Sequence, residues 1–337
     1  MEGEKEEEQV MSEVHLGCPP GFSGSYVSHF TFPLPSTNMP DERYDDNDRL
    51  KLEVASSQEI ILDDDGDLLL TRRNDKNRRY LNYGFIIRHN ITSSLGNVGL
   101  QVWRAAMVLT DFVLHKSLTS SDFNDIIALE LGAGTGLVGI ALARVARTVF
   151  ITDRGMEVLG NCAANVELNS DLLKFREPSI YIRELDWKET WPPNLQTCDF
   201  SSQPRTRYSW ASSEIQEAER ATLLLAADVI YSDELTDSFF SILERLMAWG
   251  SEKVLYLALE KRYNFSLEEL DVVANGYAHF RSLLKDGEEY GGHGDTMLPR
   301  FVGELINLGQ IPQYIREYER GKDLEIWKIT YCSTRLK

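Results

Sequence analysis

The chain has 337 residues, which at roughly 150 residues per domain allows one large domain or two ordinary ones. Hydrophobic residues make up 42% and charged residues 26%, values typical of a globular protein, so wholesale disorder is excluded. Aspartate and glutamate number 53 against 35 lysines and arginines, for a net charge of -18. We therefore expect no direct binding of nucleic acid, since this charge repels phosphates, and an attraction for basic partners.

The cysteines and the N-terminus indicate a cellular compartment. Four cysteines (Cys18, Cys162, Cys198 and Cys332) are scattered, and neither they nor the six histidines have metal-ligand spacing, so we predict no metal site and a reducing environment. The first ten residues, MEGEKEEEQV, are acidic, unlike a signal or transit peptide, and no stretch reaches the roughly 18 apolar residues of a membrane span. We expect a protein of the nucleus, the cytoplasm or both, with no membrane partner.

The first hundred residues fall into two predicted regions. Residues 1–49 are predicted to be a flexible acidic region, because they contain a charge run and the Pro-, Asp- and Asn-rich segment 33–49. Residues 50–97 are predicted to be a β-rich extension. There, apolar runs flank DDDGD, which predicts a hairpin with its tip at Asp65-Gly66.

From residue 98 to 335, apolar strand-like runs alternate with amphipathic helical stretches. Strands are predicted at 126–132, 148–153, 179–185, 222–230, 253–260 and 324–331, and helices at 100–116, 136–147, 156–169, 234–248 and 266–285, with a polar insert at 188–220. Strands that alternate with helices indicate βαβ units. We therefore predict one α/β domain with a doubly wound, mainly parallel sheet.

A glycine-rich loop is the strongest local signal. In ELGAGTGL the predicted strand 126–132 runs into Gly132, Gly134 and Gly136 and then into a helix. Glycines let a ligand approach the backbone, and a helix N-terminus offers free N–H groups. A tight turn alone explains one glycine well and three poorly, so the pattern favours a nucleotide-type cofactor.

The neighbouring acids narrow the choice of cofactor. The loop also satisfies GxGxxG, the dinucleotide pattern, and Asp153 at the end of the next strand suits a ribose in either case. Glu130, two residues before the first glycine, suits a ligand that carries an ammonium group and no pyrophosphate. Asp186 and Trp187 place an acid and an aromatic surface at the end of the third strand, where an adenine could lie.

These residues together resemble a known family. The loop, Asp153, LDW at 185–187 and above all Asp228-Val229-Ile230-Tyr231 resemble the seven-stranded S-adenosylmethionine-dependent methyltransferases, and within them the family 16 protein-lysine methyltransferases, which carry a [DE]xx[YF] motif. QVWRAA at 101–106 is similar to the tryptophan helix of that family. The resemblance covers most of residues 80 to 332 and implies a Rossmann-like sheet of seven strands with S-adenosylmethionine as cofactor.

The resemblance also implies a role for each residue. It assigns Gly132, Gly134 and Gly136 to the methionine and ribose portion of the cofactor, Asp153 to the ribose hydroxyls, Asp186 and Trp187 to the adenine side, Trp103 to a wall of the cofactor pocket, and Asp228 and Tyr231 to the substrate. Each residue taken alone also has a structural interpretation. The tryptophans could be core aromatics, Asp153 a helix N-cap and Asp228 a strand-end acid.

The predicted reaction is transfer of a methyl group to a lysine side chain of a protein. This displacement needs mainly positioning and a neutral amine, and Asp228 can orient the amine while water takes the proton. Asp233, Glu234 and Asp237 add negative charge that suits a lysine-bearing substrate, which the resemblance implies to be a nuclear protein that binds nucleic acid. Three alternatives stay open: methylation of a small molecule or nucleic acid, an NAD-dependent oxidoreductase, and a binding module without catalysis.

Overall fold

The structure, a computed structural model, describes residues 9–11, 14, 24–35, 80–173, 178–193, 207–266, 271–286 and 300–332. The chain divides into two compact units, one made of Met1–Thr31 and Gly84–Lys337 and the other of Phe32–Tyr83. In the second unit the rings of Phe32 and Tyr83 stack, with centroids 6.2 Å apart. The hairpin predicted at Asp65-Gly66 lies outside the described residues, and the predicted boundaries at 49 and 97 stay predictions.

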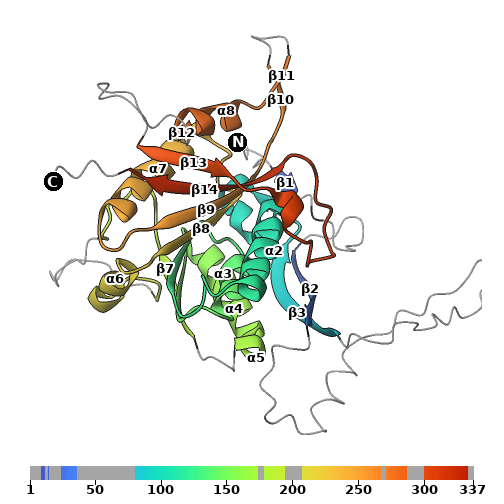
Figure 1. The fold of residues 1–337 in the computed structure, drawn as a ribbon. Helices are drawn as coiled ribbons and strands as arrows, with labels where there is room; N and C mark the ends of the chain where they lie inside the picture. Colours follow the sequence, from blue (N-terminus) through green and yellow to red (C-terminus); the bar gives the residue numbers. More distant parts are fainter. Residues whose placement is uncertain are drawn as a thin grey trace, which may run out of the picture. The chain divides into compact units, whose positions relative to one another are not determined.

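The first unit is built on an eight-stranded sheet (Figure 1). In spatial order its strands are β12 (Leu284–Asp286), β13 (Phe301–Leu305), β14 (Leu324–Tyr331), β9 (Val254–Glu260), β8 (Leu223–Ala227), β5 (Ile127–Leu131), β6 (Thr148–Asp153) and β7 (Ser179–Glu184). Strands β9, β8, β5, β6 and β7 are parallel, whereas β14 is antiparallel to both β9 and β13. The predicted α/β class with a mainly parallel sheet is confirmed.

The number of strands differs from the prediction. The described sheet has eight strands where seven are expected, because the three-residue strand β12 pairs in parallel with β13 at the edge. The central strands were predictable because they are continuous apolar runs. IALEL in β5 is buried at every position, as expected for a parallel strand covered on both faces.

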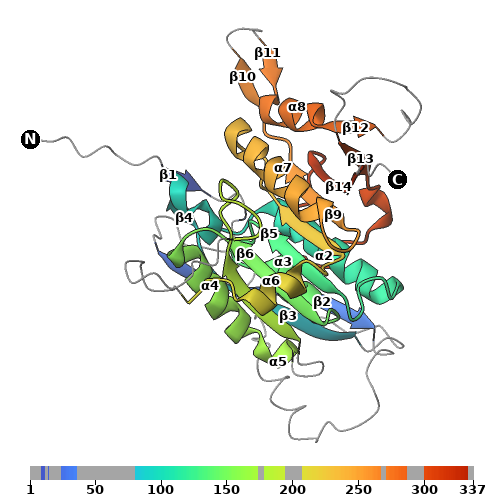
Figure 2. The same cartoon turned by 90° about the vertical axis from the view of Figure 1, so that its left-hand side faces the viewer.

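Helices cover both faces of the sheet. They are α2 (Arg104–Thr119), α3 (Leu137–Ala143), α4 (Met156–Leu168), α5 (Ser170–Leu173), α6 (Ser212–Ala218), α7 (Asp233–Ala248) and α8 (Asn275–Ser282). Successive side chains of a strand point to opposite faces. Leu129 and Leu131 belong to the buried cluster that contains Phe239 of α7, whereas Glu130 bonds to the backbone of α3. In Figure 2, strand β9 accordingly lies between α7 and α2.

Two segments differ from the predicted pattern. The helix predicted at 266–285 is a short hairpin of β10 (Asn264–Ser266) and β11 (Asp271–Val273), followed by the eight-residue helix α8. Two adjacent valines favour a strand at the start of this region, and Gly276 weakens the helix. The insert at 188–220 contains α6 and a buried tryptophan, Trp210, which stacks on Phe150 with ring centroids 5.3 Å apart. Among the described residues, no helix has both the length and the apolar character that crossing a membrane requires.

The region predicted to be flexible contains strands. β1 (Gln9–Met11) pairs antiparallel with β4 (Thr92–Ser94), and β2 (Ser25–Pro35) pairs with β3 (Tyr80–Asn90). The short 3₁₀ helix η2 (Leu95–Leu100) follows β4. Gln101 joins these elements, since its Nε2 donates to Val10 O at 2.7 Å and to Ile91 O at 3.2 Å.

A ladder of asparagines joins β3 to the sheet domain. Asn161, Asn165 and Asn169 occur at every fourth position of α4 and just after it, so their side chains lie on one face of the helix. Asn165 Oδ1 accepts from Arg88 N at 2.7 Å, and Asn169 Oδ1 accepts from Ile86 N at 2.9 Å. Their amide groups donate in return to the carbonyl oxygens of the same two residues. The asparagines therefore take the place of a neighbouring strand for this part of β3.

Asn165 also donates to Thr135 O at 2.9 Å, which ties the ladder to the glycine loop. We expect Asn165→Ala to lower the free energy of unfolding by about 2–3 kcal/mol, because it leaves the buried Thr135 O and the half-buried N–H and C=O of Arg88 without these partners. Denaturant unfolding measures the loss. Asn97→Ala is the matched control, since Asn97 bonds only at the exposed surface to Glu157, and it should change stability by less than about 0.5 kcal/mol. Equal stabilities for the two variants would contradict the role of the ladder.

Candidate active site

The predicted site residues gather at one edge of the sheet. Because β5 to β9 in the core are parallel, their carboxyl ends lie along the same edge, and the chain order reverses between β5 and β8. Gly132 follows β5, and Asp228 follows β8. Ligands of open α/β sheets bind in the crevice at such a switch point. The motif glycines and the motif acid therefore border the place where a ligand is expected.

All three motif glycines have left-handed backbones. The φ angles are +65° at Gly132, +54° at Gly134 and +78° at Gly136, a region that other residues rarely adopt. A Cβ on Gly132 would lie 2.8 Å from Val229 Cγ1 and 3.0 Å from Trp187 Cζ2, so the indole edge lies close against the loop. The backbone of the loop thus favours glycine at all three positions. In the sequence analysis, a tight turn explained only one glycine, and the other two were attributed to a ligand.

Asp153 is joined to the glycine loop. Its Oδ2 accepts from Gly134 N at 2.7 Å, and its Oδ1 accepts from Arg154 N at 2.6 Å. Burial raises the pKa of the Asp153 carboxyl, while these two hydrogen bonds and the charge of Arg154 oppose the rise. The N-cap of α4 is Gly155, so the alternative interpretation of Asp153 as the helix N-cap is wrong. A half-buried carboxylate with two filled acceptor positions keeps lone pairs for a hydroxyl ligand.

Asp186 and Trp187 lie next to this group. Asp186 Oδ2 is 3.5 Å from Arg154 Nη1, and its Oδ1 accepts from Lys188 N at 3.0 Å. Trp187 is half-buried and packs edge-on against Phe239 of α7, with ring centroids 5.0 Å apart. Trp187 therefore packs on the core through Phe239 and also borders the glycine loop. Its position is compatible with both interpretations of the sequence, a core aromatic and a surface for the adenine.

Glu130 is committed to the chain itself. Its side chain is buried under α3, where Oε2 accepts from Gly139 N at 2.9 Å, and a Cβ on Gly139 would lie only 2.4 Å from that oxygen. Burial raises the pKa of Glu130 to about 8. The predicted contact with the ammonium group of a cofactor stays a prediction, and this geometry favours a neutral carboxyl that packs α3 on β5.

The raised pKa makes stability depend on pH. A folded-state pKa near 8, against 4.5 unperturbed, means that the folded protein holds the proton more tightly, so stability is lost as pH rises from about 4.5 to about 8. We expect Glu130→Gln to remove this pH dependence. Between pH 4.5 and 8 the free energy of unfolding of the variant should rise by up to about 4 kcal/mol relative to that of the native protein. Unfolding by denaturant at pH 5, 6.5 and 8 measures it, with the exposed Glu167→Gln as control. Parallel stability curves for native protein and Glu130→Gln would contradict the assignment.

Asp228 is buried and paired with an arginine. Its side chain is 4% exposed, and its Oδ2 lies 2.5 Å from Arg262 Nη2. Its backbone has φ +56°, an uncommon conformation for a residue other than glycine, and its N–H donates to Ala258 O at 2.9 Å. Strained backbone of this kind costs on the order of 1 kcal/mol and occurs often at functional sites. The acid of the DxxY motif is thus held in a fixed place and has its charge balanced.

The start of α2 meets the end of β9 beside this pair. Trp103 precedes α2, and the Arg262 guanidinium lies over its indole ring, 4.9 Å from the centroid. The next residue, Arg104, forms a two-point ion pair with Glu260, through Nε to Oε2 at 3.1 Å and Nη2 to Oε1 at 2.5 Å. Trp103 Nε1 donates to Val98 O at 3.1 Å. These contacts fix the orientation of the indole.

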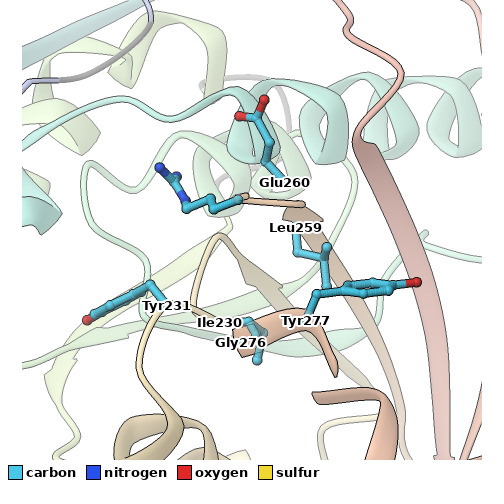
Figure 3. Close-up of a pocket in the computed structure, with 7 residues that line it drawn as sticks. Ile230, Tyr231, Leu259, Glu260, Gly276 and Tyr277 are labelled. Carbon is cyan, nitrogen blue, oxygen red and sulfur yellow. The ribbon is translucent and has the colours of Figure 1, made fainter. Parts of the chain in front are cut away.

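Tyr231 borders a small pocket of about 90 Å³. The pocket is lined by Ile230, Tyr231, Leu259, Glu260, Arg262, Gly276 and Tyr277. Figure 3 shows the rings of Tyr231 and Tyr277 directed to opposite sides, with Ile230 and Leu259 between them. Tyr231 is 46% exposed; partial burial raises the pKa of its hydroxyl, and the charges of Asp153 and Asp228 add to the rise. Tyr231 is therefore close enough to both Asp153 and Asp228 for their charges to act on its hydroxyl.

The structure brings nine of the ten predicted residues to this edge, and the tenth, Glu130, lies beneath it. Sequence analysis did not predict two ion pairs of the site, Arg262 with Asp228 and Arg104 with Glu260. Long-range pairs of this kind join positions 34 and 156 residues apart, so no local pattern predicts them.

Comparison with known proteins agrees with this site. A sequence profile described as lysine methyltransferase, family 16, matches residues 86–200. The chain is 40% identical over 245 residues to human methyltransferase-like protein 22 (72% of this chain, 56% of that protein) and 39% identical to the mouse protein over the same length (72% and 58%). It is 34% identical over 167 residues to mouse protein N-lysine methyltransferase METTL21A (49% and 62%).

The chain spans little more than half the length of the curated relatives it matches. The matched profile covers part of β3, the glycine loop, Asp153 and Trp187, among them residues that sequence analysis predicts to bind a cofactor. The family predicted from the motifs is therefore confirmed. The chain is similar to family 16 of the lysine methyltransferases over residues 86–200, and to methyltransferase-like protein 22 over 245 residues.

Proposed function

We propose that the protein is a protein-lysine N-methyltransferase that uses S-adenosylmethionine. The observation that carries the proposal is the arrangement at the switch point of the sheet. Gly132, with Trp187 against it, follows β5, and Asp228 with its buried carboxylate follows the neighbouring parallel strand β8. A cofactor on one side and an amine on the other would meet in the crevice between them.

The residues present fit the cofactor. The left-handed loop leaves its backbone open to close approach, Asp153 offers a carboxylate for ribose hydroxyls, and Trp187 with Asp186 offers an aromatic surface and an acid for the adenine side. Trp103 would form a wall of the pocket. When bound, S-adenosylmethionine supplies an electrophilic methyl group on sulfur.

The substrate side fits an amine. Lysine has a reference pKa near 10.4, so the site must first attract the ammonium form and then let it lose a proton. The buried carboxylate of Asp228 attracts and orients the ammonium group, Tyr231 lies beside it, and water carries the proton away. The pair at 228 and 231 thus positions the nitrogen, and no covalent intermediate with the protein is needed.

The substrate and the compartment also belong to the proposal. A basic protein segment suits the net charge of -18, and a nuclear protein that binds nucleic acid is what the resemblance implies. A nuclear or cytoplasmic location is supported by the buried Cys162, which forms no disulfide within the described residues. Microscopy of a fluorescent fusion tests the location, and exclusive labelling of a secretory compartment would refute it.

Binding of S-adenosylhomocysteine tests the cofactor. We expect calorimetry of the purified full chain to give a dissociation constant in the micromolar range, roughly -8 kcal/mol, and no binding of NAD⁺ at the same concentration. Binding of NAD⁺ alone would replace the proposal with an oxidoreductase. Binding of S-adenosylhomocysteine without any methylation of extract proteins would leave a binding module.

A further inference from the structure

Two contacts and one unsatisfied N–H group set Arg262 apart from the other cations at this edge. Its Nη2 pairs with Asp228 at 2.5 Å, and its guanidinium covers the face of Trp103. Its Nε is buried and has no hydrogen-bond partner within the described part of the chain. A buried N–H without a partner is unfavourable, so the contacts with Asp228 and Trp103 must offset the desolvation of Nε to hold Arg262 in this position.

Arg262 also stands between the pocket and Asp228. The pocket is lined by Arg262 and by the last two residues of the motif, Ile230 and Tyr231, and its lining does not include Asp228. The Asp228 side chain is 4% exposed, whereas that of Arg262 is 37% exposed. A side chain that enters the pocket therefore meets the guanidinium before it can reach the carboxylate.

We infer that Arg262 occupies the ammonium position of the site in the free protein and that the substrate lysine must displace it. We define the cation site as the carboxylate of Asp228 together with the ring face of Trp103. Both groups attract cations. This inference rests on the proposed function, because it takes the displacing cation to be the substrate lysine. Arg262 is then a specificity-determining residue.

The expected specificity follows from the covalent attachment of Arg262. A tethered cation competes at a high effective concentration, so a small free amine, which offers only its own charge, is excluded. A protein substrate adds contacts beyond the cation site, where the pocket-lining Tyr231 and the sequence neighbour of Arg262, Tyr263, are 46% and 50% exposed. Those contacts can offset the displacement, and the site therefore selects lysines presented on a protein surface over free amines.

The test uses n-butylammonium, which has the length and charge of a lysine side chain. Ligand-detected NMR titrations are run on the full chain and on four variants, each checked for native unfolding behaviour. Arg262→Gln removes the competing cation, and Arg262→Met does the same while keeping an apolar stem over Trp103. The double variant Asp228→Asn with Arg262→Gln also removes the carboxylate. Lys261→Gln is the matched control, because it removes a neighbouring positive charge that pairs with Glu325 instead.

We expect both single Arg262 variants to bind n-butylammonium at least tenfold more tightly than the native protein. The double variant should lose that gain, and Lys261→Gln should stay within about twofold of native. Equal affinity in native protein and in whichever Arg262 variant folds would overturn the inference, as would a gain that persists without the Asp228 carboxylate. These titrations need no cofactor, so they can succeed or fail independently of S-adenosylhomocysteine binding and of methylation.

Discussion

Asp228→Asn should abolish methyl transfer while leaving the cofactor bound. We expect the initial rate of methylation to fall by at least ~10²-fold, because an amide cannot attract the ammonium group or orient the neutral amine for attack. The affinity for S-adenosylhomocysteine should stay within about twofold of native, since the glycine loop is held by Asp153 through Gly134 N, whereas Asp228 pairs with Arg262 and bonds to Ala258 O. The separation of rate from cofactor affinity is the signature of a residue on the substrate side.

Transfer of tritium from labelled S-adenosylmethionine into proteins of a cofactor-depleted extract measures the rate, and calorimetry measures the affinity. Asp122→Asn is the matched control, because it makes the same chemical change on a mostly exposed side chain that pairs with Lys116. It should keep at least about half of the native rate. Native turnover in Asp228→Asn would remove the residue from the mechanism, and loss of S-adenosylhomocysteine binding would move it to the cofactor side.

Asp153→Ala should have the opposite effect. We expect it to weaken S-adenosylhomocysteine binding by about 10- to 100-fold, which is the loss of roughly 1.4 to 2.8 kcal/mol that one charged acceptor contributes. Two causes act together, since the ribose loses its acceptor and Gly134 N loses the partner that holds the glycine loop. The effect should appear in the dissociation constant of the cofactor.

Calorimetry of the two proteins measures the change. Asp122→Ala serves as control, because Asp122 is a mostly exposed acid paired with Lys116 before β5, at the other end of that strand from the glycine loop. Its affinity should match that of the native protein. If Asp153→Ala binds S-adenosylhomocysteine as tightly as native, the acid does not hold the ribose, and the half-buried carboxylate serves the loop alone.

The core of the fold was predictable because its signals are local. The apolar runs of β5 and β8 and the turn glycines between β5 and α3 are all read within a few residues. Asp153 was predictable for the same reason, since a polar residue that ends a buried strand must lie at the edge of the sheet. Parallel strands then brought it to the same edge as Asp228 without further information.

The parts that were missed depend on contacts between distant residues. The asparagine ladder gives no local signal, because Asn165 on a helix is ordinarily a surface residue and its partner Arg88 is 77 residues away. The same holds for Arg262, whose neighbours in sequence reveal neither Asp228 nor Trp103. For Glu130 the local signal pointed to a different role. Its place beside the loop predicted a contact with the cofactor, whereas its side chain is buried under α3 and accepts from Gly139 N.

Methyl transfer to lysine is the central claim, and amino-acid analysis tests it most directly. The purified full chain is incubated with labelled S-adenosylmethionine and cofactor-depleted extract, with Asp228→Asn and a reaction without enzyme alongside. The labelled proteins are then hydrolysed and their amino acids separated. The account predicts label in methylated lysine that depends on the native enzyme. Label confined to other amino acids or to nucleic acid, or label equal with native enzyme and without it, would contradict the account.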